Sequence, residues 1–186
     1  PEITFTFTGQ ITEFDPTVAN GTLFSGISVG DTFAALLTYD PSQSPVERLP
    51  TFTVNREFTF AVRVQTSSGV VTFASWTQAF LRIENDRGRT NVANGWDSIS
   101  IPSNANRGGP NAGIQLIDSD GTALSHPSLP TTLDLSLFEK AVVQISSGSD
   151  PFSFYRGVIT GVSIEREVGW AISLTDKRFV DWAVIN

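Results

Sequence analysis

The segment best suited to metal chemistry is Asp118-Ser119-Asp120-Gly121. Two aspartates at positions i and i+2 offer the hard oxygen ligands that calcium prefers, and a glycine permits the sharp turn between ligands. The calcium loop is incomplete, because its twelfth position, counted from Asp118, is Leu129 rather than glutamate. The same pattern is typical of an ordinary turn. Asp118 and Asp120 are therefore predicted either as calcium ligands or as turn residues, and no cofactor is required.

Side chains that serve catalysis are scarce. The chain has 1 histidine and no cysteine, so a serine triad would depend on His126, which lies in the proline-flanked segment 124–130. Carboxylate pairs suited to a glycosidase exist at Glu165 and Glu167 and at Asp118 and Asp120, and their separation in space decides that role. Alternate residues of one strand share a face and are ordinarily solvated. We expect no enzyme, with glycoside hydrolysis as the open alternative.

Tryptophan offers a route to carbohydrate binding, because a flat indole ring stacks on the apolar face of a sugar and keeps a polar N–H for a partner. Most of the aromatic side chains are expected in the core. Trp76 and Trp96 lie next to predicted strand ends and loops. These two residues are the predicted glycan-binding pair, with extracellular polysaccharide as the partner.

The charge balance excludes one class of partner. The chain carries 12 Lys and Arg against 19 Asp and Glu, a formal charge of -7, and such a molecule repels a polyanion. Nucleic acid is therefore excluded as a partner. No apolar stretch reaches the roughly 20 residues that span a bilayer, so no membrane span is expected.

Apolar and polar side chains alternate along much of the chain, and this pattern predicts β-strands. The candidate site residues must therefore be positioned by strands and by the loops between them. Residues 3–8, 32–39 and 58–64 alternate most clearly, and Ser67-Ser68-Gly69 predicts a hairpin turn after the third. A loop rich in proline and serine is expected at 41–50. Further strands are predicted at 79–84, 97–101, 114–118, 131–137, 141–146, 154–165 and 170–174.

No segment keeps a helical period beyond about two turns, and the separators are rich in Gly, Pro, Asn and Ser. The sequence therefore predicts an all-β fold, an antiparallel two-sheet β-sandwich with a jelly-roll-like arrangement. Composition does not separate a sandwich from a closed barrel. The length of 186 residues suits a single domain over 1–186.

Two absences indicate export. The sequence contains no Met, including at position 1, so a natural chain that begins at Pro1 has lost an upstream segment, usually a signal peptide. The lack of cysteine suits an exported bacterial protein whose folding is independent of redox conditions. We expect a secreted protein, extracellular or on the surface of a bacterium.

Five short segments together resemble the exported domains of bacterial proteins that carry the PEP-CTERM sorting signal. They are F-T-F-T-G-Q-I at 5–11, V-G-D-T-F-A-A-L-L-T-Y-D at 29–40, W-D-S-I-S-I at 96–101, L-I-D-S-D-G-T at 116–122 and F-Y-R-G-V-I-T-G-V at 154–162. The resemblance implies export, removal of a signal peptide and a C-terminal sorting tail, which this sequence does not contain. It also implies a role in extracellular matrix or surface material.

The ends of the chain offer a route to self-assembly. Segment 175–186 includes the apolar residues Phe179, Trp182 and Val184, and the first strand has a threonine face. Either is a candidate donor strand for the sheet edge of a neighbouring subunit, and contacts of this kind that do not close produce filaments. The alternative is that both termini are strands of their own domain.

The sequence therefore predicts a non-catalytic extracellular or cell-surface protein with a structural or adhesive role, which self-assembles through its terminal strands. The alternative is a lectin-like module that binds glycans, with calcium as a candidate ion.

Overall fold

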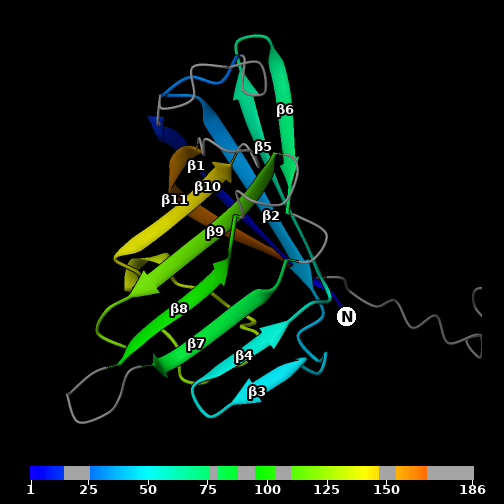
Figure 1. Ribbon diagram of the computed structural model, residues 1–186, viewed down its shortest axis with the longest axis vertical. Helices are drawn as coiled ribbons and strands as arrows, with labels where there is room; N and C mark the ends of the chain where they lie inside the picture. The colour runs from blue at the N-terminus through cyan, green and yellow to red at the C-terminus, as the bar shows by residue number, and fades with distance from the viewer. Residues whose placement is uncertain (15–25, 76–78, 88–94, 104–109, 147–153, 167–186) are drawn as a thin grey trace, which may run out of the picture.

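The computed structural model describes residues 1–14, 26–75, 79–87, 95–103, 110–146 and 154–166 (Figure 1). The described chain is built from β-strands, which confirms the all-β prediction. The strands are β1 (Ile3–Phe14), β2 (Thr32–Tyr39), β3 (Glu47–Leu49), β4 (Phe52–Asn55), β5 (Phe58–Thr66), β6 (Gly69–Ala74), β7 (Leu81–Arg87), β8 (Trp96–Ile101), β9 (Asn111–Asp118), β10 (Lys140–Ser146) and β11 (Phe154–Arg166). A single 3-10 turn, η1 (Leu135–Leu137), precedes β10.

Hydrogen bonds join the 11 described strands into one sheet in the order β3-β4-β7-β8-β9-β10-β11-β1-β2-β5-β6. Every pairing is antiparallel, as predicted. The sheet bends round on itself, because β5 and β6 lie close to β9 although four or five strands separate them in this order. The described strands thus form one continuous sheet around the core, and the jelly-roll-like, two-sheet sandwich arrangement stays a prediction.

The core lies on the concave side of the bent sheet. Phe5 and Phe7 of β1, Leu37 of β2 and Val62 of β5 are almost fully buried, while the alternate residues of these strands face outward. The ring of Phe5 stacks on that of Tyr39, with 5.8 Å between the ring centroids. Full burial of each such side chain contributes about 1.5–3 kcal/mol, so the alternation in the sequence is also the largest source of stability.

The pairing of β1 with β11 contains two register shifts. Thr8 lies opposite Gly161 and Gly9 opposite Ile159, so that Thr160 is an extra residue on β11. Such a β-bulge bends a strand and turns a side chain out of its regular position. A second shift follows between Ile11 and Glu13.

Two sequence predictions differ from the structure. Residues 131–137 alternate Leu with polar residues, yet they form an irregular segment that ends in η1, because the Asp134 side chain accepts a hydrogen bond from the Ser136 amide and starts a turn. The predicted loop 41–50 contains the short strand β3, which pairs with β4. The predicted strand 170–174 lies outside the described residues.

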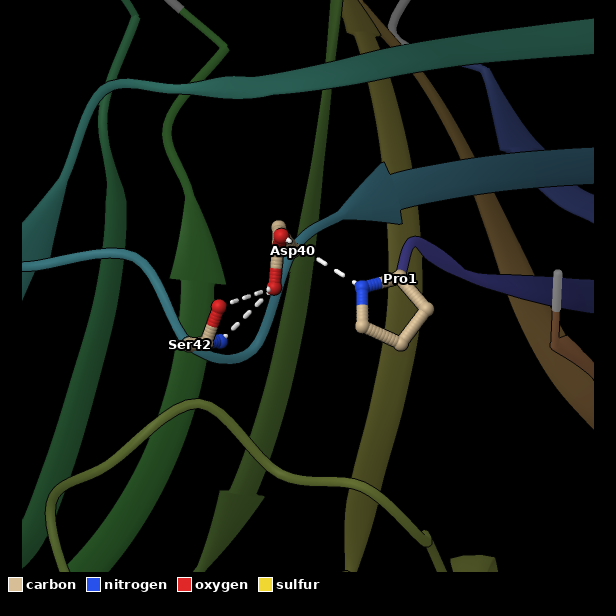
Figure 2. A network of polar contacts seen from close by, with 3 residues as sticks. All are labelled: Pro1, Asp40 and Ser42. Atoms are coloured by element: carbon tan, nitrogen blue, oxygen red, sulfur yellow. Dashed lines mark hydrogen bonds and ion pairs between the residues drawn. The ribbon is translucent and has the colours of Figure 1, made fainter. Parts of the chain in front are cut away.

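Asp40 ends β2, as its position before Pro41 predicts. Its carboxylate accepts hydrogen bonds from the hydroxyl and the amide of Ser42, at 2.7 and 2.9 Å, and these bonds lower the pKa of Asp40. The Pro1 ammonium lies 3.6 Å from the same carboxylate (Figure 2). These groups are exposed, so this ion pair contributes little to stability. The pairing of Ile3 with Tyr39 is what holds the start of β1 beside the end of β2.

Candidate functional site

The long segment between β9 and β10 is held by a buried carboxylate. Asp118, the last residue of β9, is 1% exposed. One of its oxygens accepts the amide of Asp120 at 3.0 Å, and the other accepts the amides of Thr122 and Ala123 at 2.7 and 2.8 Å. Hydrogen bonds to a charged acceptor are stronger than those between neutral groups. Asp118 therefore fixes the path of the chain as it leaves the sheet.

A second buried carboxylate extends this arrangement. Asp97 of β8 lies opposite Asp118 in the register and accepts the amide of Asp86 at 2.9 Å and that of Leu124 at 2.7 Å. Burial raises the pKa of Asp97, the two amides oppose this effect, and the charges of Asp118 and Asp86 add to it. The two aspartates thus join β7, β8 and β9 to the same loop.

The pKa of Asp118 moves the other way. Burial raises it, but the amides of Asp120, Ala123 and Thr122 together bring it below the ordinary value of an aspartate. Accepted hydrogen bonds favour the charged form of a carboxylate. Asp118 is therefore held ionised in the folded protein.

The turn predicted at residues 118–121 is present. Gly121 has a φ of +70°, which L side chains rarely adopt, and a β-carbon there would overlap the carbonyl oxygen of Gly95. The side chain of Asp120 accepts the amide of Thr122 at 3.2 Å. Backbone requirements thus explain both the glycine and the aspartates.

Calcium binding by Asp118 and Asp120 stays a prediction. A calcium site needs six to eight oxygen ligands, whereas both oxygens of Asp118 already accept backbone amides. Within the described part of the chain, no group of three or more His, Cys, Asp or Glu side chains is arranged to hold a metal ion.

Four further hydrogen bonds from strands or neighbouring segments fasten the same loop. The hydroxyls of Thr53 and Tyr39 donate to the carbonyls of Pro127 and Pro130, each at 2.6 Å. The side-chain amide of Asn85 donates to the Leu124 carbonyl at 3.2 Å, and the backbone amide of Ser119 donates to the Glu139 carboxylate at 2.9 Å. His126 is an exposed residue of this loop.

Trp96, the first residue of β8, presents its ring on the outer surface beside this loop. Its side chain is 45% exposed, and its indole N–H donates to Glu84 at 3.3 Å. Glu84 also accepts the hydroxyl of Ser98 at 2.7 Å and lies 2.9 Å from Nε of Arg82. The Arg82 guanidinium lies over the ring of Phe52 at 4.7 Å. A buried polar network therefore holds an exposed aromatic ring in place, as a binding surface requires.

The structure brings some predicted residues together and leaves others outside. Trp96 and Asp118 meet at one end of the sheet, because Trp96 directly precedes Asp97, the register partner of Asp118. Glu165 is an exposed residue of β11. The sequence did not indicate Glu84 or Asn85, whose partners are distant in the chain, whereas Asp97 was predicted as a further oxygen ligand if its loop lay near Asp118. Outside the described residues lie Trp76, Glu167, Phe179, Trp182, Val184 and the segment 175–186.

The two edge strands of the described sheet differ in how well they are protected against pairing with a strand of another chain. At one edge, β3 is 3 residues long and two of them are charged, Glu47 and Arg48, with prolines at 45 and 50. Short length, charge and proline all discourage pairing with another chain. At the other edge, β6 is 6 residues long, and neither charge nor proline occurs from Gln65 to Phe80. The β6 edge therefore lacks these protections.

Comparisons of the chain with protein-family models, with curated proteins and with solved structures gave no match. In the part of the chain that the structure describes, no helix is long and apolar enough to cross a membrane.

Proposed function

We propose that this chain is a non-catalytic structural or adhesive protein of the bacterial exterior, which self-assembles by strand addition at β6. The observation that carries the proposal is the β6 edge, which pairs only with β5 among the described strands. A β-branched, uncharged edge strand is a template for a strand from another chain. Figure 1 shows the β5–β6 hairpin at the top of the view, at one extreme of the described strands.

The hydrogen-bond pattern identifies which residues of β6 face the open edge. The Ser75 amide donates to the Phe60 carbonyl at 2.9 Å, and bonding to the partner strand alternates along an antiparallel pair. Phe73 and Val71 therefore bond to β5, whereas the amides of Thr72 and Val70 point away from it. Val70 is also 59% exposed. An incoming strand would bond to these outward amides and carbonyls.

The donor strand is the segment 175–186, with the apolar residues Phe179, Trp182 and Val184. The first strand is a poor donor, because β1 pairs with β11 on one side and with β2 on the other. A strand bonded on both sides has no free edge to give to a neighbour. The alternative, that the C-terminal segment belongs to its own domain, predicts a monomer.

Export of the PEP-CTERM type is part of the same proposal, with this chain as an exported domain of such a protein. The five resembling segments and the absence of cysteine support it. His126 is the one histidine of the sequence, which has no cysteine. This scarcity of catalytic side chains supports a structural role in surface material. The role of such a domain is to connect subunits rather than to transform a substrate.

The substitution Thr72→Pro tests the assembly. It removes an outward amide without removing a bond to β5, and proline is tolerated in edge strands. We expect the wild type to form concentration-dependent oligomers or filaments by light scattering and electron microscopy, and Thr72→Pro to reduce them at least tenfold. Deletion of 178–186 should have the same effect.

Thr59→Lys is the matched control for a second edge variant, Thr72→Lys. Both threonines are exposed, but Thr59 pairs with Thr38 of β2 and lies outside the residues of β5 that pair with β6. A lysine should block assembly only at Thr72. If the wild type is a monomer at all concentrations, or if both edge variants assemble normally, the proposal fails.

A second candidate function is lectin-like glycan binding at Trp96, favoured by the exposed ring that Glu84 holds in place. We expect neutral oligosaccharides to change the tryptophan fluorescence of the wild type, and Trp96→Ala to remove that change. Leu137→Ala, at a residue 43% exposed on η1, is the control. Equal fluorescence changes in the wild type and in Trp96→Ala would disprove binding at this ring. Titration with calcium chloride, followed by a chelator, tests whether glycan binding depends on calcium. If it does, Asp120→Asn should also abolish the fluorescence change.

A further inference from the structure

The outer face of the sheet contains a groove of about 530 Å³ that crosses five strands. Its residues come from β11, β1, β2, β5 and β6. Pockets that bind small molecules have volumes of about 300–1,000 Å³, and neighbouring strands lie about 4.8 Å apart, so five strands extend over about 19 Å. The groove is therefore elongated and suits part of a chain molecule better than a compact ligand.

The β-bulge between β1 and β11 lies at this groove. The extra residue Thr160 lines it, together with Thr8 and Gly9. Gly9 lacks a side chain because a β-carbon there would overlap the Val158 carbonyl and lie 2.7 Å from the Phe33 ring. The floor is completed by Ala34, a small residue on an outward position of β2. The β-carbon missing at Gly9 would point into the core, so it is the small side chain of Ala34 and the bend in the strands that produce the hollow, and bulges often accompany functional sites.

The walls of the groove expose more apolar than polar surface, and their one charged side chain among the described residues is Arg63. Thr8, Thr32 and Thr160 provide hydroxyls, Gln10 and Gln65 provide amides, and Arg63 provides a guanidinium. Hydroxyls and amides both donate and accept hydrogen bonds. Among the described residues, no carboxylate lines the groove. Val70, 59% exposed, adds an apolar surface at one end.

We propose that this groove binds a segment of a neutral polysaccharide. Sugar hydroxyls need donors and acceptors together, which the threonine and glutamine side chains supply, and the apolar faces of sugar rings match Ala34 and Val70. Neutral chains are favoured over acidic ones because the molecule carries a net charge of -7, which repels polyanions. The site is separate from Trp96 and shares Val70 with the β6 edge, and it gives the proposed adhesive protein a second kind of contact.

The substitution Ala34→Tyr fills the groove, and its matched control is Ala61→Tyr. Both alanines are half-buried on outward positions of adjacent strands, but only Ala34 lines the groove. Both changes are made in a Trp96→Ala background to remove any binding at that ring. Native gels that contain a neutral glucan, a neutral galactomannan or the acidic polygalacturonate measure retardation of the protein.

We expect at least one neutral polysaccharide to retard the background protein and Ala61→Tyr, and Ala34→Tyr to weaken this binding at least tenfold. Gln65→Ala should weaken it about threefold to tenfold, the loss of one hydrogen bond of about 0.5–1.5 kcal/mol. Equal melting temperatures of the two tyrosine variants confirm that both are folded. The proposal would be overturned by any of three outcomes: no retardation by either neutral polymer, retardation by polygalacturonate alone, or equal retardation of Ala34→Tyr and Ala61→Tyr. None of these outcomes alters the assembly test at Thr72.

Discussion

Asp118→Ala is expected to lower the free energy of unfolding by about 3–5 kcal/mol, the usual cost of removing one partner from a buried charged interaction, because three backbone amides lose a charged acceptor. The side chain is 1% exposed, so little water replaces it. For a chain of this size the melting temperature should fall by roughly 6–20 °C. Thermal unfolding followed by circular dichroism measures the change.

The pH dependence of stability gives a second measurement on the same residue. The pKa of Asp118 is lowered in the folded protein, so its contribution is present above the unfolded pKa of about 3.9 and is lost as pH falls through the folded value. The raised pKa of Asp97 works in the opposite sense, because protonation then favours the folded state. The wild type should lose more stability than Asp118→Asn between pH 5 and pH 2.

Asp134→Ala is the control for both measurements. Asp134 also accepts a backbone amide, from Ser136 at 3.0 Å, but its side chain is exposed. A much smaller loss is expected there. If Asp118→Ala melts within 2 °C of the wild type, the loop between β9 and β10 is held by other contacts and the role given to Asp118 is wrong.

Gly9→Ala is expected to destabilise the protein by about 3 kcal/mol or more, at the upper end of overpacking effects. The new methyl group would overlap the Val158 carbonyl and press on the Phe33 ring, 2.7 Å away. Neither can move freely, since Val158 belongs to a paired strand and Phe33 is buried. The yield of soluble protein and the midpoint of urea unfolding should both fall.

Gly161→Ala tests whether space, rather than glycine itself, sets this cost. It lies on the same strand pair as Gly9, and the nearest atom to an added methyl group is the hydroxyl of Thr8 at 2.8 Å, which can rotate away. We expect near-normal stability. Equal losses at both positions would show that the bulge geometry is not what requires Gly9.

Local pattern was enough to predict the strands whose two faces differ. β2 was predicted with its observed bounds, because its apolar residues alternate and Asp40-Pro41 ends it. The hairpin turn between β5 and β6 was also predicted, from Ser67-Ser68-Gly69. By contrast β4 has 4 residues, and it is a strand because β3 and β7 pair with it. A pairing partner distant in sequence leaves no local signal.

The same distinction applies to the candidate site. The turn at residues 118–121 was predicted, since its glycine and aspartates are neighbours in the chain. The bond between Asp97 and the Leu124 amide joins residues 27 apart, and it exists only because β8 pairs with β9. The outer groove depends on a register shift between β1 and β11, which composition and periodicity do not specify.

The pairing of β1 with β11 determines when the molecule can fold. β1, the first of the described strands, bonds along its length to β11, the last of them, so the described sheet cannot be completed until β11 is available. Contacts between distant segments slow folding because a long loop must first be closed. The chain therefore stays open until β11 is available, and only then can β1 gain both of its partners.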